Sequence, residues 1–259
     1  MNVARRMLDK ALDRFGLEKK SKNQYYKTQL PVEFTEFERQ AYEYVKKNRL
    51  SITYDRGLIA TILACRHVSE HAVPGDFVEC GVWRGGNAIL AAMLFKEYGV
   101  EKRVYLFDTF EGMTEPTEAD VAAASNKPAI EIFRELQRET HNDMCYASFD
   151  DVQSNFRDSG LLTDAVRFIQ GDVLQTLRDE ANLPHHIALL RLDTDWYEST
   201  RLELDVLYPR LSRGGILIID DYGYWTGARK AADEYFSTVA ARPFLQYVDF
   251  TGRMAVKLD

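Results

Sequence analysis

Five short apolar runs, each followed by a stretch of helical character, constrain the fold of this chain more than any other feature. The predicted strands cover residues 76–80, 103–107, 165–170, 187–192 and 215–219. Strands that alternate with helical crossovers are typical of a doubly wound parallel sheet, because parallel neighbours need a long connection. Residues 244–249 and 253–258 are separated only by Phe-Thr-Gly, which predicts an antiparallel hairpin. The predicted fold class is therefore α/β, with a mostly parallel sheet closed by a C-terminal hairpin.

A single domain, residues 1–259, is expected, because a chain of 259 residues that is 46% hydrophobic can bury one large core. An N-terminal helical extension, residues 1–73, precedes the first strand. Apolar residues at helical spacing predict helices at 31–48 and 54–71 within it. Thr35 is the expected N-cap of the first of these two helices.

The connection between the second and third strands, residues 109–164, is unusually long. Connections of this length in a compact domain contain their own helices or serve as lids. Helical spacing predicts helices at 129–139 and 149–158, whereas the acidic, alanine-rich stretch 115–127 is predicted to be mobile. We therefore expect a helical lid or insertion at this place in the fold.

Charge and cysteine content exclude several classes of partner. The chain has 33 basic and 40 acidic residues, and its net charge of −7 argues against nucleic acid and against anionic lipid. Cys65, Cys80 and Cys145 show no paired spacing, so neither a disulfide framework nor a zinc site is predicted. A reducing cytoplasm is the expected location, because no apolar run is long enough to span a bilayer and no signal peptide is evident. The basic segment 1–27 is expected to form a helix that packs on the core or on a second subunit.

Acidic residues follow the fourth and fifth predicted strands, at the sheet edge where α/β proteins bind ligands. They are Asp193, Asp195, Asp220 and Asp221. Neighbouring strands lie about 4.8 Å apart, and Mg²⁺ takes oxygen ligands at roughly 2.1 Å. Asp193, Asp220 and Asp221 could therefore share one ion. The alternative that Asp220 and Asp221 cap the following helix stays open.

A glycine-rich turn follows the first strand, where Glu79 precedes Gly81-Val82-Trp83-Arg84-Gly85-Gly86. Small residues let the backbone approach a ligand, but this spacing lacks a glycine of the dinucleotide fingerprint, which weakens an NAD interpretation.

The second and third strands also end in polar residues. The second ends at Phe107-Asp108, where a carboxylate can accept hydrogen bonds from ribose hydroxyls, and the third ends at Gln170-Gly171-Asp172, which suits an adenine edge. Each of these features is also common as a structural turn or helix cap. Together they predict a groove that runs from an adenosine site to a metal site.

Four phrases of the chain resemble the macrocin-type O-methyltransferase family. They lie at residues 74–86, 107–113, 192–200 and 214–222. The resemblance implies a class I methyltransferase fold, S-adenosylmethionine and Mg²⁺ as cofactors, a homodimer or higher homo-oligomer, and a role in natural product or antibiotic biosynthesis. It implies a small-molecule acceptor, most often a sugar of a glycosylated natural product.

The resemblance also implies roles for residues of this chain. Asp193, Asp220 and Asp221 would hold the metal, and Asp195 would be the general base. The residues it places around S-adenosylmethionine are Glu79, Gly81, Val82, Trp83, Arg84, Asp108, Thr109, Gly171, Asp172 and Asp193.

The chemistry requires an acceptor hydroxyl to lose its proton while it attacks a sulfonium methyl group in line. A divalent ion that binds two vicinal hydroxyls lowers their pKa and fixes the angle of attack. Asp195, two residues beyond Asp193, would then accept the proton. His141 is the rival base, and Trp196 is expected either in the core or at the acceptor surface. A catechol acceptor, an NAD(P)-dependent oxidoreductase and a non-catalytic binding module are the competing functions.

Overall fold

The structure is a computed structural model that describes residues 30–259, so the helix predicted for residues 1–27 lies outside the described residues. The chain divides into two compact units, Met1–Phe34 and Thr35–Asp259. All the helices and strands reported below belong to the second unit.

The second unit is built on a seven-stranded sheet. Its strands are β1 (Asp76–Cys80), β2 (Val104–Asp108), β3 (Val166–Gln170), β4 (Ile187–Leu192), β5 (Leu211–Ile219), β6 (Gln246–Tyr247) and β7 (Arg253–Val256). Their order is β3-β2-β1-β4-β5-β7-β6, with the first five parallel and β7 antiparallel to both β5 and β6. The predicted α/β class and the C-terminal antiparallel hairpin are confirmed.

Strand boundaries differ from the prediction by more than one residue in β5 and in the two hairpin strands. Strand β5 begins at Leu211 rather than at residue 215, because Leu211 pairs with Ile187 before the register shifts. The hairpin strands are shorter than predicted, and Phe244 and Phe250 stay exposed outside them.

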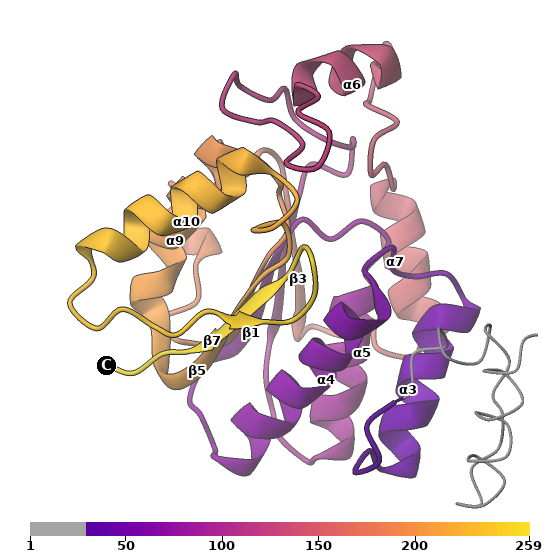
Figure 1. The fold of residues 1–259 in the computed structure, drawn as a ribbon. Coiled ribbons are helices and arrows are strands. Elements are labelled where there is room, and N and C mark those ends of the chain that lie inside the picture. The colour runs from indigo at the N-terminus through magenta and orange to yellow at the C-terminus, as the bar shows by residue number, and fades with distance from the viewer. Residues whose placement is uncertain (1–29) are drawn as a thin grey trace, which may run out of the picture. The chain divides into compact units, whose positions relative to one another are not determined.

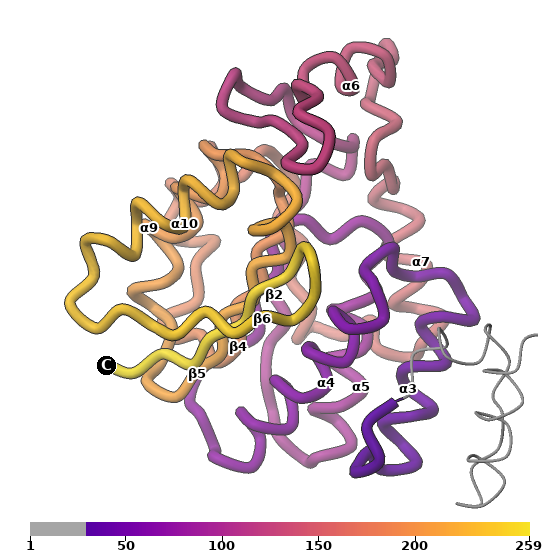
Figure 2. The backbone as a smooth tube through the Cα atoms, viewed as in Figure 1, coloured from indigo at the N-terminus to yellow at the C-terminus, as the bar shows by residue number. Residues whose placement is uncertain are grey.

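Helices cover both faces of this sheet (Figure 1). They are α3 (Glu36–Lys47), α4 (Asp55–Glu70), α5 (Gly86–Glu97), α6 (Ala129–Leu136), α7 (Phe149–Asp158), α8 (Val173–Thr176), α9 (Tyr197–Leu207) and α10 (Thr226–Thr238), with 3-10 turns η1 (Glu180–Asn182) and η2 (Tyr208–Arg210). Figure 2 shows α3, α4, α5 and α7 on one side and α9 and α10 on the other. Thr35 caps α3 through a capping box with Glu38, as its position in the sequence predicted.

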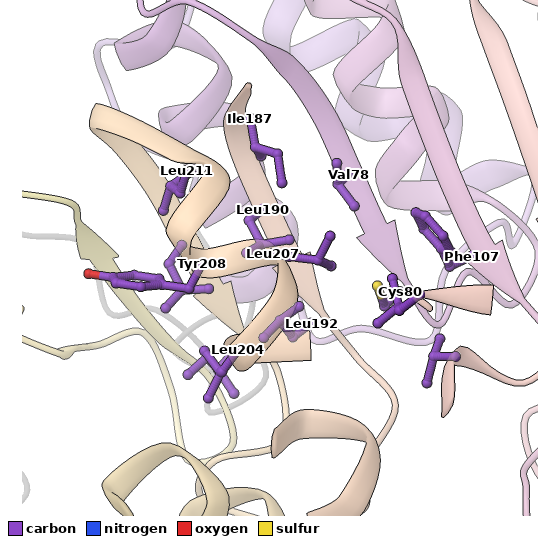
Figure 3. Packing of buried hydrophobic residues seen from close by; sticks show 14 of the residues in the cluster. Val78, Cys80, Phe107, Ile187, Leu190, Leu192, Leu204, Leu207, Tyr208 and Leu211 are labelled. Atoms are coloured by element: carbon purple, nitrogen blue, oxygen red, sulfur yellow. The ribbon is translucent and has the colours of Figure 1, made fainter. Parts of the chain in front are cut away.

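The sheet face under α9 is mostly apolar. Leu204 and Leu207 of this helix pack against Leu190 and Leu192 of β4 in one buried cluster (Figure 3). Each fully buried leucine contributes roughly 2 kcal/mol to folding. Because strand residues alternate between faces, Arg191 between these two leucines points to the opposite face of the sheet.

The insertion after β2 contains α6 and α7, as predicted, and α6 lies at the top of the view in Figure 1. Helix α6 ends at Leu136, earlier than predicted, because Gln137 forms an antiparallel bridge with Asn142. The stretch 115–127, predicted to be mobile, is anchored by Asp120, which is fully buried and accepts a hydrogen bond from the Tyr197 backbone N–H at 2.8 Å. Within residues 30–259, every helix falls short of the length and apolar character that a bilayer span requires.

Candidate active site

A cavity of about 400 Å³ opens at the carboxyl ends of β1, β4 and β5. The strand order places β1 beside β4 at the point where the winding reverses, and ligands of open α/β sheets bind at such a point. A smaller cavity of about 50 Å³ shares Gly81 and Asp108 with it. The predicted site residues that line the larger cavity are Glu79, Gly81, Val82, Trp83, Asp108, Asp193, Asp195, Asp220 and Asp221. Those that line only the smaller one are Thr109, Gly171 and Asp172.

The glycine turn brings the backbone of β1 against the backbone after β4. Gly81 has a φ of +79°, and a Cβ there would lie 1.9 Å from the Asp193 carbonyl oxygen. Only glycine tolerates both the left-handed backbone and this approach. Gly85, also left-handed at φ +84°, is the N-cap residue of α5. The turn therefore has its shape fixed by its glycines, and the free N–H groups of α5 begin beside the cavity.

Asp108 holds this turn in place. Its Oδ2 accepts hydrogen bonds from the backbone N–H groups of Val82 at 2.6 Å and Trp83 at 3.3 Å, and its Oδ1 accepts one from Phe110 at 2.7 Å. Burial raises the pKa of Asp108, which the backbone donors partly offset. The carboxylate predicted to bind a ribose thus also ties the ends of β1 and β2 together.

Two other predicted residues are engaged in local structure. Asp172 Oδ1 accepts a hydrogen bond from the Leu174 N–H at 2.8 Å and caps α8. Thr109 Oγ1 donates to the Gly112 carbonyl at 2.7 Å.

Arg84 is not brought to the site. Its guanidinium donates to Asp151 of α7 at 2.7 and 3.1 Å, and to the Arg49 carbonyl at 3.0 Å. It lines neither cavity. The prediction that it contacts a cofactor relied on its place in the turn, whereas its side chain points to the insertion.

The acids after β4 and β5 gather at one end of the larger cavity. Carboxylate oxygens of Asp193, Asp195 and Asp221 lie within 4.8 Å of one another. Burial raises the pKa of Asp195 to about 7 and raises the pKa values of Asp193 and Asp221 well above their usual range. Asp221 Oδ2 is buried without a hydrogen-bond partner. Asp195 is buried and the other two residues are half-buried. Crowded carboxylates with a buried unpaired oxygen fit a divalent cation, which would offset their mutual repulsion.

Arg191 is one of two residues that the sequence prediction missed. Its side chain is 1% exposed, and its guanidinium reaches groups on three strand ends and on the loop before α4. Nη1 donates to Glu79 Oε1 at 3.1 Å and to Asp193 Oδ2 at 2.5 Å. Nη2 donates to Asp220 Oδ1 at 2.7 Å and to Thr53 Oγ1 at 3.1 Å. Asp220 therefore faces the arginine with one oxygen and stays outside the tightest carboxylate group. A single arginine within an apolar strand was the available signal.

The loop that carries Asp195 is strained, and hydrogen bonds to α9 and β1 hold it in place. Asp195 has a φ of +68°, a conformation that costs a non-glycine residue about 1–3 kcal/mol and is common at active sites. The Thr194 hydroxyl donates to Glu203 Oε1 at 2.8 Å, and Glu203 is fully buried on α9. The Asp193 N–H donates to the Cys80 carbonyl at 2.8 Å. Sequence reasoning also missed Glu203, whose helical position gives no hint of burial.

The remaining candidates lie elsewhere. His141 Nε2 lies 3.0 Å from Asp143 Oδ1, its ring stacks on Tyr146 at 4.2 Å, and it lines neither cavity. Trp196 belongs to the core, with its ring 5.0 Å from that of Trp225 and its indole N–H donated to a backbone carbonyl.

The helix-cap alternative for Asp220 and Asp221 is not realised. Helix α10 begins at Thr226, with Trp225 at its N-cap and no side-chain cap. Both carboxylates instead line the larger cavity.

This sheet order, with a glycine turn and strand-end acids around one groove, defines a class I, Rossmann-like methyltransferase fold. The solved structure of the O-methyltransferase NovP superposes with a TM-score of 0.69 at 32% identity, over 79% of this chain and 80% of that one. The calicheamicin methyltransferase CalS11 superposes with a TM-score of 0.58 at 18% identity, over 92% of this chain and 99% of that one, a likeness of fold alone.

The chain belongs to the macrocin O-methyltransferase (TylF) family, whose model matches residues 3–255. A tetracenomycin 4'-O-methyltransferase from Streptomyces olivaceus, which acts on a rhamnosyl derivative, is 39% identical over 71% of this chain and 67% of its own length. The mycinamicin III 3''-O-methyltransferase of Micromonospora griseorubida is 38% identical over 63% of this chain and 61% of its own length. The predicted family and the assignment as an O-methyltransferase are confirmed.

Proposed function

We propose that this enzyme transfers a methyl group from S-adenosylmethionine to one hydroxyl of a vicinal diol, with Mg²⁺ bound beside the acceptor. The acceptor is a sugar of a glycosylated natural product. One observation carries the proposal: a single cavity joins the glycine turn after β1 to the carboxylates after β4 and β5. Donor and acceptor sites are therefore continuous.

The cofactor occupies the part of the groove beside the glycine turn. Gly81 allows the backbone to approach a ligand, and Gly171 with Asp172 provides the wall for an adenine. Glu79 supports this placement, because its Oε2 is buried at the cavity without a hydrogen-bond partner. A buried unpaired acceptor is costly, so a donor group of the ligand would satisfy it.

Asp193, Asp220 and Asp221 hold the magnesium ion. When bound, the ion would supply acidity to the two acceptor hydroxyls and fix their orientation. Asp221 contributes its unpaired Oδ2, whereas Asp193 and Asp220 each retain one oxygen that Arg191 does not occupy. The ligand set predicted from sequence is retained in this proposal, although the group of carboxylates within 4.8 Å of one another contains Asp195 and not Asp220.

Asp195 accepts the proton of the attacking hydroxyl. Its carboxylate lies in the same cluster and its main chain is held in a left-handed conformation, which aims the side chain into the groove. The insertion forms the wall on the acceptor side with Met113, Ile132 and Met144. These apolar side chains exclude water from the reacting groups.

Assembly and location are part of the proposal. A homodimer or higher homo-oligomer follows from the family resemblance, and sedimentation equilibrium tests it. A cytoplasmic location fits the three cysteines, which are all free thiols.

Calorimetry with S-adenosylmethionine and with NAD⁺, each with and without Mg²⁺, tests the cofactor assignment. We expect S-adenosylmethionine to bind and NAD⁺ to give no heat. Methyl transfer to an alkyl rhamnoside and to catechol, with Mg²⁺ present or chelated, then tests acceptor and metal. Tight NAD⁺ binding, or full turnover in the presence of chelator, would overturn the proposal, and a preference for catechol would reassign the acceptor.

A further inference from the structure

Arg191 forms a hydrogen bond with one oxygen of each of two carboxylates. Nη1 donates to Asp193 Oδ2 and Nη2 to Asp220 Oδ1. The guanidinium is fully buried, so it cannot exchange these partners for water. Its planar fork is further fixed by Glu79 and Thr53, which accept from Nη1 and Nη2 respectively. Acceptors on both Nη1 and Nη2 therefore fix the position and the orientation of the guanidinium.

These hydrogen bonds limit the number of oxygens that each of the two carboxylates can offer to a cation. A carboxylate that chelates an ion uses both oxygens, and in that mode Asp193 Oδ2 or Asp220 Oδ1 would face the ion and the buried guanidinium at once. The fixed positive charge of Arg191 therefore disfavours chelation by either carboxylate. Ca²⁺ takes six to eight oxygen ligands and often binds carboxylates through both oxygens. Mg²⁺ takes six ligands in a compact octahedron and keeps positions for water or substrate. One free oxygen on each carboxylate suits the smaller ion.

We propose that Arg191 is a positioning residue that restricts Asp193 and Asp220 to one metal-facing oxygen each, and that it thereby makes the site discriminate against Ca²⁺. The inference rests on the proposed magnesium site and adds to it the reason for ion selectivity. Arg191 touches neither acceptor nor donor in this role. It acts through the two acids that flank it.

Arg191→Lys is the sharpest test, because lysine keeps the buried positive charge but replaces the fork by a single ammonium group. Calorimetric titration with MgCl2 and with CaCl2 gives the ratio of the two affinities for each protein. Partners that orient metal ligands typically alter metal affinity by about 10–100-fold when they are removed. We expect the ratio of Ca²⁺ to Mg²⁺ affinity to rise about tenfold in Arg191→Lys. An unchanged ratio in the folded variant would overturn the role of Arg191.

Arg210→Lys is the matched control, because Arg210 donates to both oxygens of exposed Glu180 and lies in the 3-10 turn η2. Its ratio should equal that of the wild type. A wild type that binds neither ion would contradict the magnesium site itself, which separates that failure from failure of the selectivity argument. Thermal melting checks that each variant folds.

A second pair of variants covers the case in which Arg191→Lys does not fold. Thr53→Val removes one acceptor that fixes Nη2, whereas Thr53→Ser keeps the hydroxyl. We expect Thr53→Val to raise the Ca²⁺ to Mg²⁺ ratio about threefold, less than removal of the fork, and Thr53→Ser to leave it unchanged. Equal ratios in the two variants would contradict the proposal.

Discussion

The two ends of the groove are built by different means. After β1 and β2 the main chain sets the shape, through left-handed glycines and backbone N–H groups gathered on Asp108. After β4 and β5 side-chain charge sets it, through Arg191 and the acids around it. The first end should be sensitive to added atoms and the second to altered charge. Substitutions that separate volume from charge can therefore tell the two ends apart.

Asp195→Asn offers the largest effect at the charged end. The change removes the proposed base at nearly constant volume, and loss of a general base typically lowers the rate by about 10²–10⁴-fold. Metal and cofactor affinities should change little. Turnover with saturating Mg²⁺, together with calorimetry for Mg²⁺ and S-adenosylmethionine, checks both parts.

Asp220→Asn is the counterpart that decides between two assignments. If Asp220 is a ligand, this variant should lose Mg²⁺ affinity while Asp195→Asn keeps it. The reverse result would make Asp195 the ligand, as the tighter grouping of Asp193, Asp195 and Asp221 allows.

Gly81→Ala should produce the next largest effect, at the end shaped by the main chain. The added Cβ would lie 1.9 Å from the Asp193 carbonyl oxygen at a φ of +79°. We expect a loss of about 3 kcal/mol in the free energy of unfolding, with S-adenosylmethionine affinity at least tenfold weaker. Urea unfolding and calorimetry measure the two quantities.

Gly99→Ala separates backbone strain from collision. Gly99 has a similar φ of +68°, but a Cβ there meets nothing within 4 Å. Its cost should stay near 1 kcal/mol, with cofactor affinity unchanged. Equal losses in the two variants would show that strain alone, rather than the approach of β1 to β4, explains the glycine.

Glu203 provides a smaller effect that depends on pH. Burial raises the pKa of Glu203 from 4.5 to about 8, so the folded state binds its proton more tightly than the unfolded state. The stability associated with the neutral form is present below pH 4.5 and is lost as the pH rises toward 8. Between pH 6 and 8 the wild type should therefore lose about 2 kcal/mol relative to Glu203→Gln. Urea unfolding across this range measures the difference.

Glu198→Gln is the control for that comparison, because Glu198 lies on the same helix with its side chain exposed. Its stability should follow the wild type at each pH. A Glu203→Gln profile that also follows the wild type would show that Glu203 titrates normally.

The end shaped by the main chain was the easier one to predict. Apolar runs mark the strands, and parallel strands place their carboxyl ends at one edge, so Gly81, Asp108 and Gly171 could be located without knowledge of side-chain contacts. The same rule located the acids after β4 and β5. Thr35 was also predictable, because a capping box is a local pattern.

Residues whose roles depend on distant partners were not predictable in this way. Arg191 contacts Glu79, which lies 112 positions away, and Arg84 turns to Asp151 at a separation of 67. Asp120 lies in an acidic stretch that composition alone predicts to be mobile, yet it is buried against α9. Periodicity describes one element at a time, whereas these contacts depend on how elements pack.

His141→Ala should have the smallest effect, although the pKa of free histidine made it the rival base. Its imidazole lies against Asp143 and Tyr146 on the insertion and lines neither cavity. Surface substitutions of this kind usually change stability by less than about 0.5 kcal/mol. The rate should stay within about twofold of the wild type, because a general base must lie within hydrogen-bond reach of the proton that it accepts. Turnover measured from pH 6 to 9 gives the result. A rate loss comparable to that of Asp195→Asn would mean that the insertion closes over the acceptor and carries His141 to the reacting hydroxyl.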